Sequence, residues 1–292
     1  MTDFLQLLVA GVSIGSIYAM TAIGFVLLWQ TSSTINFAQG EFIVLPAFTM
    51  VLFWVVFRFP FAAALLATIL VSTLLLGLLV HRLLVARLLR AGVLPLLIAT
   101  LGLSLLIRYS LQQFWTPLAL PFPPLFSRVP IRLGAIVLPW EELMNVLFAG
   151  AVIGALQLFI TRTKVGWAMQ AVAQNRTLAA VLGIDVSRLV TLTFVLNAAL
   201  TAVAALLIAP VYLVKYDIGI GLGLKAFYAA IIGGFNQIRG ALLGGLLVGV
   251  VETFSAAYVS GPFRDAVALV ILIAVLLWKP EGLWGVKEEW GS

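Results

Sequence analysis

The stretch TRTKVGWAMQAVAQNRTLAAVLGIDVSR, Thr161–Arg188, is a polar segment that lies between two long apolar runs. It is too polar to cross a bilayer and too long to be a turn. It carries a single acid, Asp185, against four basic residues, Arg162, Lys164, Arg176 and Arg188. Because the cytoplasmic loops of membrane proteins are enriched in Lys and Arg, the sequence predicts a cytoplasmic loop over residues 161–188.

This loop contains the signals of a short helix. Asn175 is a good N-cap, because its side-chain oxygen can accept a hydrogen bond from a free amide of the first turn. The residues that follow are rich in Ala and Leu, which favour helix, and Gly183 suits the left-handed position that ends one. We therefore predict a helix over Arg176–Leu182. Two interpretations stay open: a polar connector with one helical turn, or a docking helix that contacts a soluble partner.

The composition is that of an integral membrane protein. Hydrophobic residues make up 63% of the chain and charged residues 10%, against about 25% charged residues in soluble domains. The apolar runs lack the alternation of barrel strands, so we expect an all-α polytopic membrane protein with a single transmembrane domain over residues 1–292. The net charge of +6 fits cytoplasmic loops near anionic lipid, and no nucleic-acid partner is expected.

A membrane-spanning helix needs about 20 apolar residues, and the sequence offers eight or nine candidates. Met1-Thr2-Asp3 lacks the basic segment of a cleavable signal peptide, so the first run is expected to remain as a membrane helix. Nine spans would place the N-terminus outside and the C-terminus inside, in agreement with the basic segment 81–92. The candidates are Phe4–Trp29, Phe42–Phe57, Phe61–Val80, Val93–Gln112, Leu143–Ile160, Leu189–Tyr212, Ile218–Phe235, Ala241–Tyr258 and Ala266–Trp278.

Two polar interruptions, residues 37–41 and 233–237, indicate that some of these helices are broken or re-entrant. Paired broken helices are typical of transporters built from inverted repeats, although Gly-rich membrane turns can also resemble one another by chance. The first interruption lies within a longer polar segment, Gln30–Glu41, which places Asn36, Gln39 and Glu41 in a polar island between two spans. A carboxylate in a membrane usually faces a cavity or a partner, so these three residues are candidates for a translocation path. A satisfied structural turn at the membrane edge is the alternative.

Other polar residues are expected to have structural roles. Glu252 lies in an apolar run, where an interhelical or inter-subunit hydrogen bond is the plain interpretation, and Lys225 is expected to extend to the outer interface. His81 stands among arginines and is expected to be solvated. We find no nucleotide-binding motif, catalytic set or metal-ligand cluster, so the chain is not expected to be an enzyme or to bind a metal.

Four stretches resemble the permeases of branched-chain amino acid ABC transporters, of the LivH type. They are TKVGWAMQAVAQNRTLAAVLGID (Thr163–Asp185), GVSIGSIYAMTAIGFVLLWQTSSTINFAQGEF (Gly11–Phe42), GLKAFYAAIIGGFNQIRGALLGGLLVGVVE (Gly223–Glu252) and DAVALVILIAVLLWKPEGLWG (Asp265–Gly285). The resemblance implies a multi-pass permease of the bacterial cytoplasmic (inner) membrane that imports a branched-chain amino acid, another amino acid, an amide or urea.

The resemblance also implies partners. The pore would be formed with a second, related permease subunit; two ATPase subunits would supply the ATP and Mg sites, and a periplasmic or external binding protein would deliver the solute. The chain itself would hold no cofactor. The ATPase would contact the loop at Gln174, Asn175, Arg176, Ala179, Ala180 and Gly183. A self-sufficient ion-coupled transporter or channel is the alternative; the scarcity of intramembrane acids argues against a proton relay but not against sodium coupling.

Overall fold

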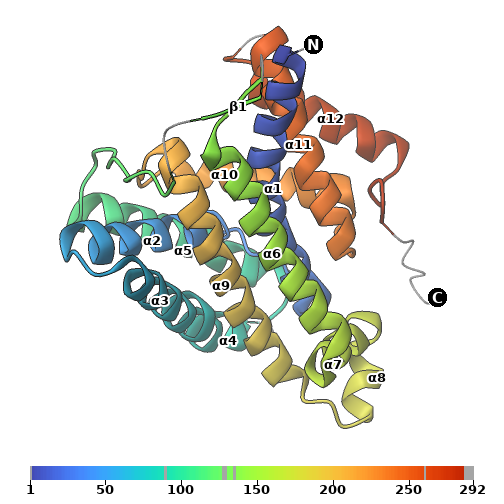
Figure 1. Cartoon of the computed structure of the whole chain (residues 1–292). Coiled ribbons are helices and arrows are strands. Elements are labelled where there is room, and N and C mark those ends of the chain that lie inside the picture. The colour runs from blue at the N-terminus through green and yellow to red at the C-terminus, as the bar shows by residue number, and fades with distance from the viewer. Residues whose placement is uncertain (1, 89–90, 127–129, 134–135, 260, 286–292) are drawn as a thin grey trace. The chain divides into compact units, whose positions relative to one another are not determined.

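The computed structural model describes residues 2–88, 91–126, 130–133, 136–259 and 261–285, and these are mostly helical (Figure 1). One small antiparallel hairpin pairs β1 (Ile131–Leu133) with β2 (Ile136–Leu138). The helices are α1 (Thr2–Ser32), α2 (Glu41–Met50), η1 (Val51–Val56), α3 (Phe61–Ser72), η2 (Thr73–Leu79), η3 (His81–Val85), α4 (Ala86–Leu88), α5 (Val93–Phe114), α6 (Trp140–Arg162), α7 (Lys164–Gln174), α8 (Arg176–Val181), α9 (Val186–Tyr212), α10 (Ile218–Gly233), α11 (Ile238–Tyr258) and α12 (Arg264–Trp278). The η segments have the wide turns of π-helix.

Six of the described helices are long and apolar enough to cross a bilayer, and they confirm an all-α polytopic membrane fold. They are Asp3–Ser32, Phe61–Leu88, Val93–Phe114, Trp140–Arg162, Val186–Tyr212 and Ile238–Tyr258. Two shorter apolar helices, Glu41–Val56 and Ile218–Gly233, fall on predicted runs as well. In each case the apolar run forms a helix because backbone polar groups in lipid must be satisfied within the segment.

The helices break at the predicted interruptions. Backbone without regular helix, residues 33–40, separates α1 from α2, and Ser33 has a positive φ of 52° there. Residues 234–237 likewise separate α10 from α11. The first break contains two residues of the predicted polar island, Asn36 and Gln39, and the third, Glu41, is the first residue of α2.

Contacts divide the chain into two compact units, of which unit 1 comprises residues 1–26, 124–150 and 224–292. In unit 1, α1 and α11 pack through glycine. A Cβ atom on Gly249 would collide with the backbone of Gly15 and Gly11, so only glycine permits this approach. Small residues are typical where membrane helices meet, because they allow the backbones to come close.

Unit 1 also contains an ionic cluster that joins four helices, in which Lys225 and Glu252 are buried. The Lys225 ammonium of α10 lies 2.6 Å from Glu252 Oε1 of α11 and 3.0 Å from Asp265 Oδ1 of α12. The Tyr18 hydroxyl of α1 donates to Glu252 Oε2 at 2.9 Å. The interhelical hydrogen bond expected of Glu252 is thus confirmed. The expectation that Lys225 extends to the interface is wrong: it is 7% exposed, because two carboxylates neutralise its charge within the unit.

Unit 2 comprises residues 27–123 and 151–223, and α2 lies at its centre. α2 lies against α3, α5 and α9, and α9 also lies along η2. Nearly every residue of α2 is buried, including its first residue, Glu41. This arrangement surrounds the polar start of α2 with side chains from α5 and α9.

Candidate functional site

The polar stretch 161–188 contains two helices, α7 and α8, where the sequence predicted one. After α6 ends at Arg162, the Thr163 hydroxyl accepts a hydrogen bond from the Gly166 amide at 3.0 Å and caps α7. α7 buries Gly166, Met169 and Val172, which are spaced by three residues and so lie on one face of the helix. Because α7 also contains Lys and Gln residues, this narrow apolar stripe is hard to detect in the sequence.

Both ends of α8 are closed by the residues that the sequence indicated. Asn175 Oδ1 accepts a hydrogen bond from the Leu178 amide at 2.9 Å, so the predicted N-cap is confirmed. Gly183 has a φ of 84°, and the amides of Gly183 and Ile184 donate to the carbonyls of Ala180 and Ala179, each at 3.0 Å. This pair of bonds is a Schellman motif. The helix ends at Val181, one residue before the predicted end.

One side of α8 and its C-cap is apolar and exposed. Leu178, Val181 and Leu182 are 59%, 78% and 80% exposed. Their spacing of three and four residues places them together on one side of the turn. These apolar residues were not among the predicted contact residues, although the same spacing is visible in the sequence.

The predicted coupling residues lie around this apolar face. Gln174 is the last residue of α7, and Asn175 and Gly183 are the capping residues just described. Arg176 and Ala180 line a cavity. Ala179 is 2% exposed, so it holds α8 against the rest of the loop. The structure thus brings the six residues together, but gives them different surroundings.

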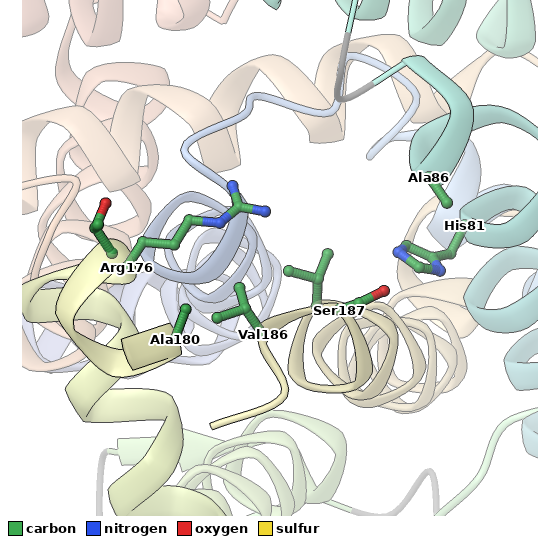
Figure 2. Close-up of a pocket in the computed structure, with 8 residues that line it drawn as sticks. His81, Ala86, Arg176, Ala180, Val186 and Ser187 are labelled. Atoms are coloured by element: carbon green, nitrogen blue, oxygen red, sulfur yellow. The ribbon is translucent and has the colours of Figure 1, made fainter. Parts of the chain in front are cut away.

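The cavity beside α8 has a volume of about 510 Å³ (Figure 2). Three segments of unit 2 line it: the η3 and α4 region, α8, and the first turns of α9. Figure 2 shows the Arg176 side chain extending across the cavity from α8. Among the residues that the structure describes, Arg176 has no ion-pair partner. The lining residues are His81, Ala86, Arg176, Thr177, Ala180, Val186, Ser187 and Val190.

The His81 side chain, on η3, contacts two residues of α9. It is 4% exposed, and its Nδ1 atom lies 3.2 Å from the Thr191 hydroxyl. Its ring also contacts Phe194, with a distance of 5.3 Å between ring centroids. The expectation of a solvated histidine is therefore wrong, because α9 covers the ring with side chains that the local sequence around His81 does not reveal.

The polar island at the start of α2 is tied to two neighbouring helices. Glu41 is 1% exposed; it forms an ion pair with Arg108 of α5 and accepts a hydrogen bond from Ser104 at 2.8 Å. Gln39 and Asn197 of α9 exchange two amide hydrogen bonds, of 2.8 and 2.9 Å. Neither these partners nor this arrangement is visible in the local sequence around Gln39 and Glu41.

Three polar atoms of the island are buried without a hydrogen-bond partner in the described part of the chain: Asn36 Nδ2, Glu41 Oε2 and Arg108 Nε. Asn36 uses its other amide atom, Oδ1, to accept from the Ala38 amide at 3.1 Å. A buried unpaired polar atom is costly. The island therefore combines strong internal pairing with remaining capacity to bind water or a polar solute.

The comparisons with known proteins cover nearly the whole chain. The family profile described as branched-chain amino acid transport system, permease component, matches residues 7–276. The chain belongs to this family. It is 35% identical over 298 residues to the high-affinity branched-chain amino acid transport permease BraD of Pseudomonas aeruginosa, with 98% of this chain and 97% of BraD covered. It is 33% identical over 305 residues to LivH of Salmonella typhimurium, with 98% and 96% covered.

A more distant relative in the comparison is a permease of another import system. The chain is 29% identical over 196 residues to LsrC of Klebsiella pneumoniae, an autoinducer 2 import permease, with 63% of this chain and 55% of LsrC covered. No solved structure matches the chain. Family membership and the six long apolar helices together make the chain a multi-pass transport permease subunit.

Proposed function

We propose that this chain is a translocation subunit of an ATP-driven importer in a bacterial cytoplasmic membrane, and that its solute is a branched-chain amino acid or a related small polar molecule. The similarity to BraD, 35% identity over nearly the full length of both chains, supports this solute class. The observation that carries the coupling role is α8, a helix capped at both ends that exposes Leu178, Val181 and Leu182. Such an apolar patch on a soluble loop favours a protein contact.

In this proposal two ATPase subunits supply the ATP and Mg sites, and the chain itself catalyses no reaction. A second permease subunit completes the pore, and an external solute-binding protein delivers the solute. The membrane segments number eight or nine: the six long helices and the two shorter apolar helices make eight, and α12 would be the ninth. The N-terminus is then outside, and the 161–188 loop faces the cytoplasm.

Movement of α8 would pass directly to α9. Only residues 182–185 join the two helices, and Asp185 caps α9 by accepting from the Arg188 amide at 3.1 Å. Asn197, about three turns further along α9, holds Gln39 of the polar island. We propose that this connection transmits closure of the ATPase pair from α8 to the start of α2.

The polar island would then act as a gate on the translocation path. Asn36, Gln39 and Glu41 supply donors and acceptors suited to a small polar solute. Asn36 Nδ2 and Glu41 Oε2 are buried without a hydrogen-bond partner in the described part of the chain, and a passing solute can use these polar atoms. Displacing α9 would break the amide pair between Gln39 and Asn197, and so would loosen the island when ATP binds.

The apolar face of α8 can be tested by adding charge to it. The double variant Leu178→Asp and Val181→Asp would be expressed with the ATPase, the second permease and the binding protein. We expect the ATPase to be lost on purification of the complex, because burying two carboxylates in an apolar contact is costly. Val259→Asp is the matched control: this valine is also exposed, at 70%, but it follows α11 in unit 1.

Retention of the ATPase by the double variant, with normal solute-stimulated hydrolysis, would exclude α8 as the docking helix. Loss of the ATPase in the Val259→Asp control as well would show a general effect of added charge. Insertion into the membrane is checked in each case by size-exclusion chromatography of the purified subunit.

A further inference from the structure

The cavity beside α8 has the chemistry of an anion site. Four polar residues line it, Arg176, Thr177, Ser187 and His81, and no carboxylate is among its described lining residues. The Arg176 side chain extends from α8 toward the cavity (Figure 2). A guanidinium without a carboxylate partner is well suited to a phosphate group, which it can bind with two parallel hydrogen bonds.

The position of the cavity indicates where the phosphate comes from. His81 and Ala86 belong to the apolar helix Phe61–Leu88, so one wall of the cavity lies near the C-terminal end of a candidate membrane span. Arg82 and Arg87 on the same segment are exposed, and residues 81–92 contain no acid. Basic pockets at the ends of membrane helices attract anionic lipid headgroups.

The surroundings also suit the apolar part of a lipid. Leu79 and Leu83 flank His81 in the sequence and are 50% and 51% exposed. A cavity of about 510 Å³ lies within the range of about 300–1,000 Å³ that is usual for small-molecule sites. We propose that this cavity binds the phosphate of an anionic phospholipid headgroup, with Arg176 as its principal ligand and Thr177 and Ser187 as hydrogen-bond donors.

A bound headgroup would connect α8 to η3 and α9, because those segments form the walls of the cavity. It would therefore hold α8 in one orientation relative to the helices that it is proposed to move. This consequence rests on the proposed coupling function, whereas binding of the lipid does not. Anionic lipid in the cytoplasmic leaflet would then set how efficiently ATP hydrolysis drives transport.

The binding test uses the full-length chain, purified and delipidated in detergent. Phosphatidylglycerol, phosphatidylcholine and inorganic phosphate are titrated separately, and bound molecules are counted by native mass spectrometry. We expect phosphatidylglycerol to bind more tightly than the other two. Arg176→Gln should weaken its binding about tenfold, the usual loss when one charge-assisted contact is removed. Ser187→Ala should weaken it less.

Arg188→Gln is the matched control, since it removes the same charge from the same loop. The Arg188 side chain is 89% exposed and pairs with Asp185, and it does not line the cavity. Equal losses in the two arginine variants would overturn the proposal, because they would show binding to general surface charge. Equal binding of phosphatidylcholine, or saturation of the site by inorganic phosphate in the presence of phosphatidylglycerol, would overturn the assignment to an anionic lipid.

The effect on coupling is measured separately, in nanodiscs with and without phosphatidylglycerol. Wild type should show higher solute-stimulated hydrolysis with the anionic lipid, and Arg176→Gln should remove that difference. If lipid binds but hydrolysis does not respond in either protein, the site stands and its proposed coupling effect is wrong. If the ATPase does not associate at all, the proposed function fails independently of the lipid site.

Discussion

The stability of α8 should depend on its two caps, because the helix is so short. α8 has six residues, whereas isolated helices of fewer than about 12–15 residues are marginal in water. Asn175→Ala removes the acceptor for the Leu178 amide, and loss of such a cap costs about 1 kcal/mol. Gly183→Ala forces a Cβ atom into the left-handed region at a φ of 84°, which costs about 1–2 kcal/mol.

A loss of about 1 kcal/mol corresponds to a roughly fivefold change in the equilibrium between the closed and the open helix. Hydrogen exchange of the purified chain, followed by mass spectrometry of peptides over residues 176–184, reports this equilibrium. We expect about fivefold faster exchange of the protected amides in Asn175→Ala, and at least that in Gly183→Ala. Peptides from the middle of α9 should exchange at the wild-type rate.

Asn175→Asp is the matched control, because aspartate keeps the acceptor oxygen and is an equally good N-cap. It should exchange within about a factor of two of wild type. Unchanged exchange in Asn175→Ala, or equal acceleration in Asn175→Ala and Asn175→Asp, would refute the claim that the cap stabilises α8. Acceleration that extends through α9 would show that the caps support a larger unit than α8.

Three further predictions concern stability, measured by thermal unfolding in detergent. Lys225→Met leaves Glu252 buried without its nearest cation and should lower the free energy of unfolding by about 3–5 kcal/mol. Adding Glu252→Gln should recover part of this stability. An equally unstable double variant would contradict coupling between Lys225 and Glu252. Gly249→Ala should destabilise the protein, because the new Cβ atom would clash with the backbone of α1. Gly150→Ala has open space around its Cβ atom and should be neutral or slightly stabilising. Equal unfolding temperatures of the two variants would contradict the packing argument. Asn197→Leu should cost about 1–3 kcal/mol because it removes both buried amide hydrogen bonds to Gln39. An unchanged unfolding temperature would contradict a structural role for that pair.

Features that depend on neighbouring residues were predictable from the sequence. The apolar runs gave the helices, and Asn175 and Gly183 gave the ends of α8, because caps act within one turn. The breaks near residues 37–41 and 233–237 were visible as polar, Gly-rich interruptions. α7 was missed because only three of its residues are buried, and its polar composition resembles that of a loop.

Contacts between distant residues could not be predicted in this way. Arg108 and Glu41 are 67 residues apart, and Gln39 and Asn197 are 158 residues apart. Each looks like an isolated polar residue in its own helix, and the sequence alone does not show which helices meet. The buried state of Lys225 escaped prediction for the same reason, since its carboxylate partners belong to other helices.

The central claim is that this chain moves solute only when an ATPase acts on α8. The most direct measurement is uptake of radiolabelled leucine into proteoliposomes that contain the permease and ATPase subunits, with ATP enclosed in the lumen and the binding protein and leucine added outside. We predict uptake that requires ATP, the second permease and the binding protein, and that is lost in the Leu178→Asp and Val181→Asp double variant. Uptake by this chain alone, driven by a sodium or proton gradient and unaffected by that variant, would contradict the account.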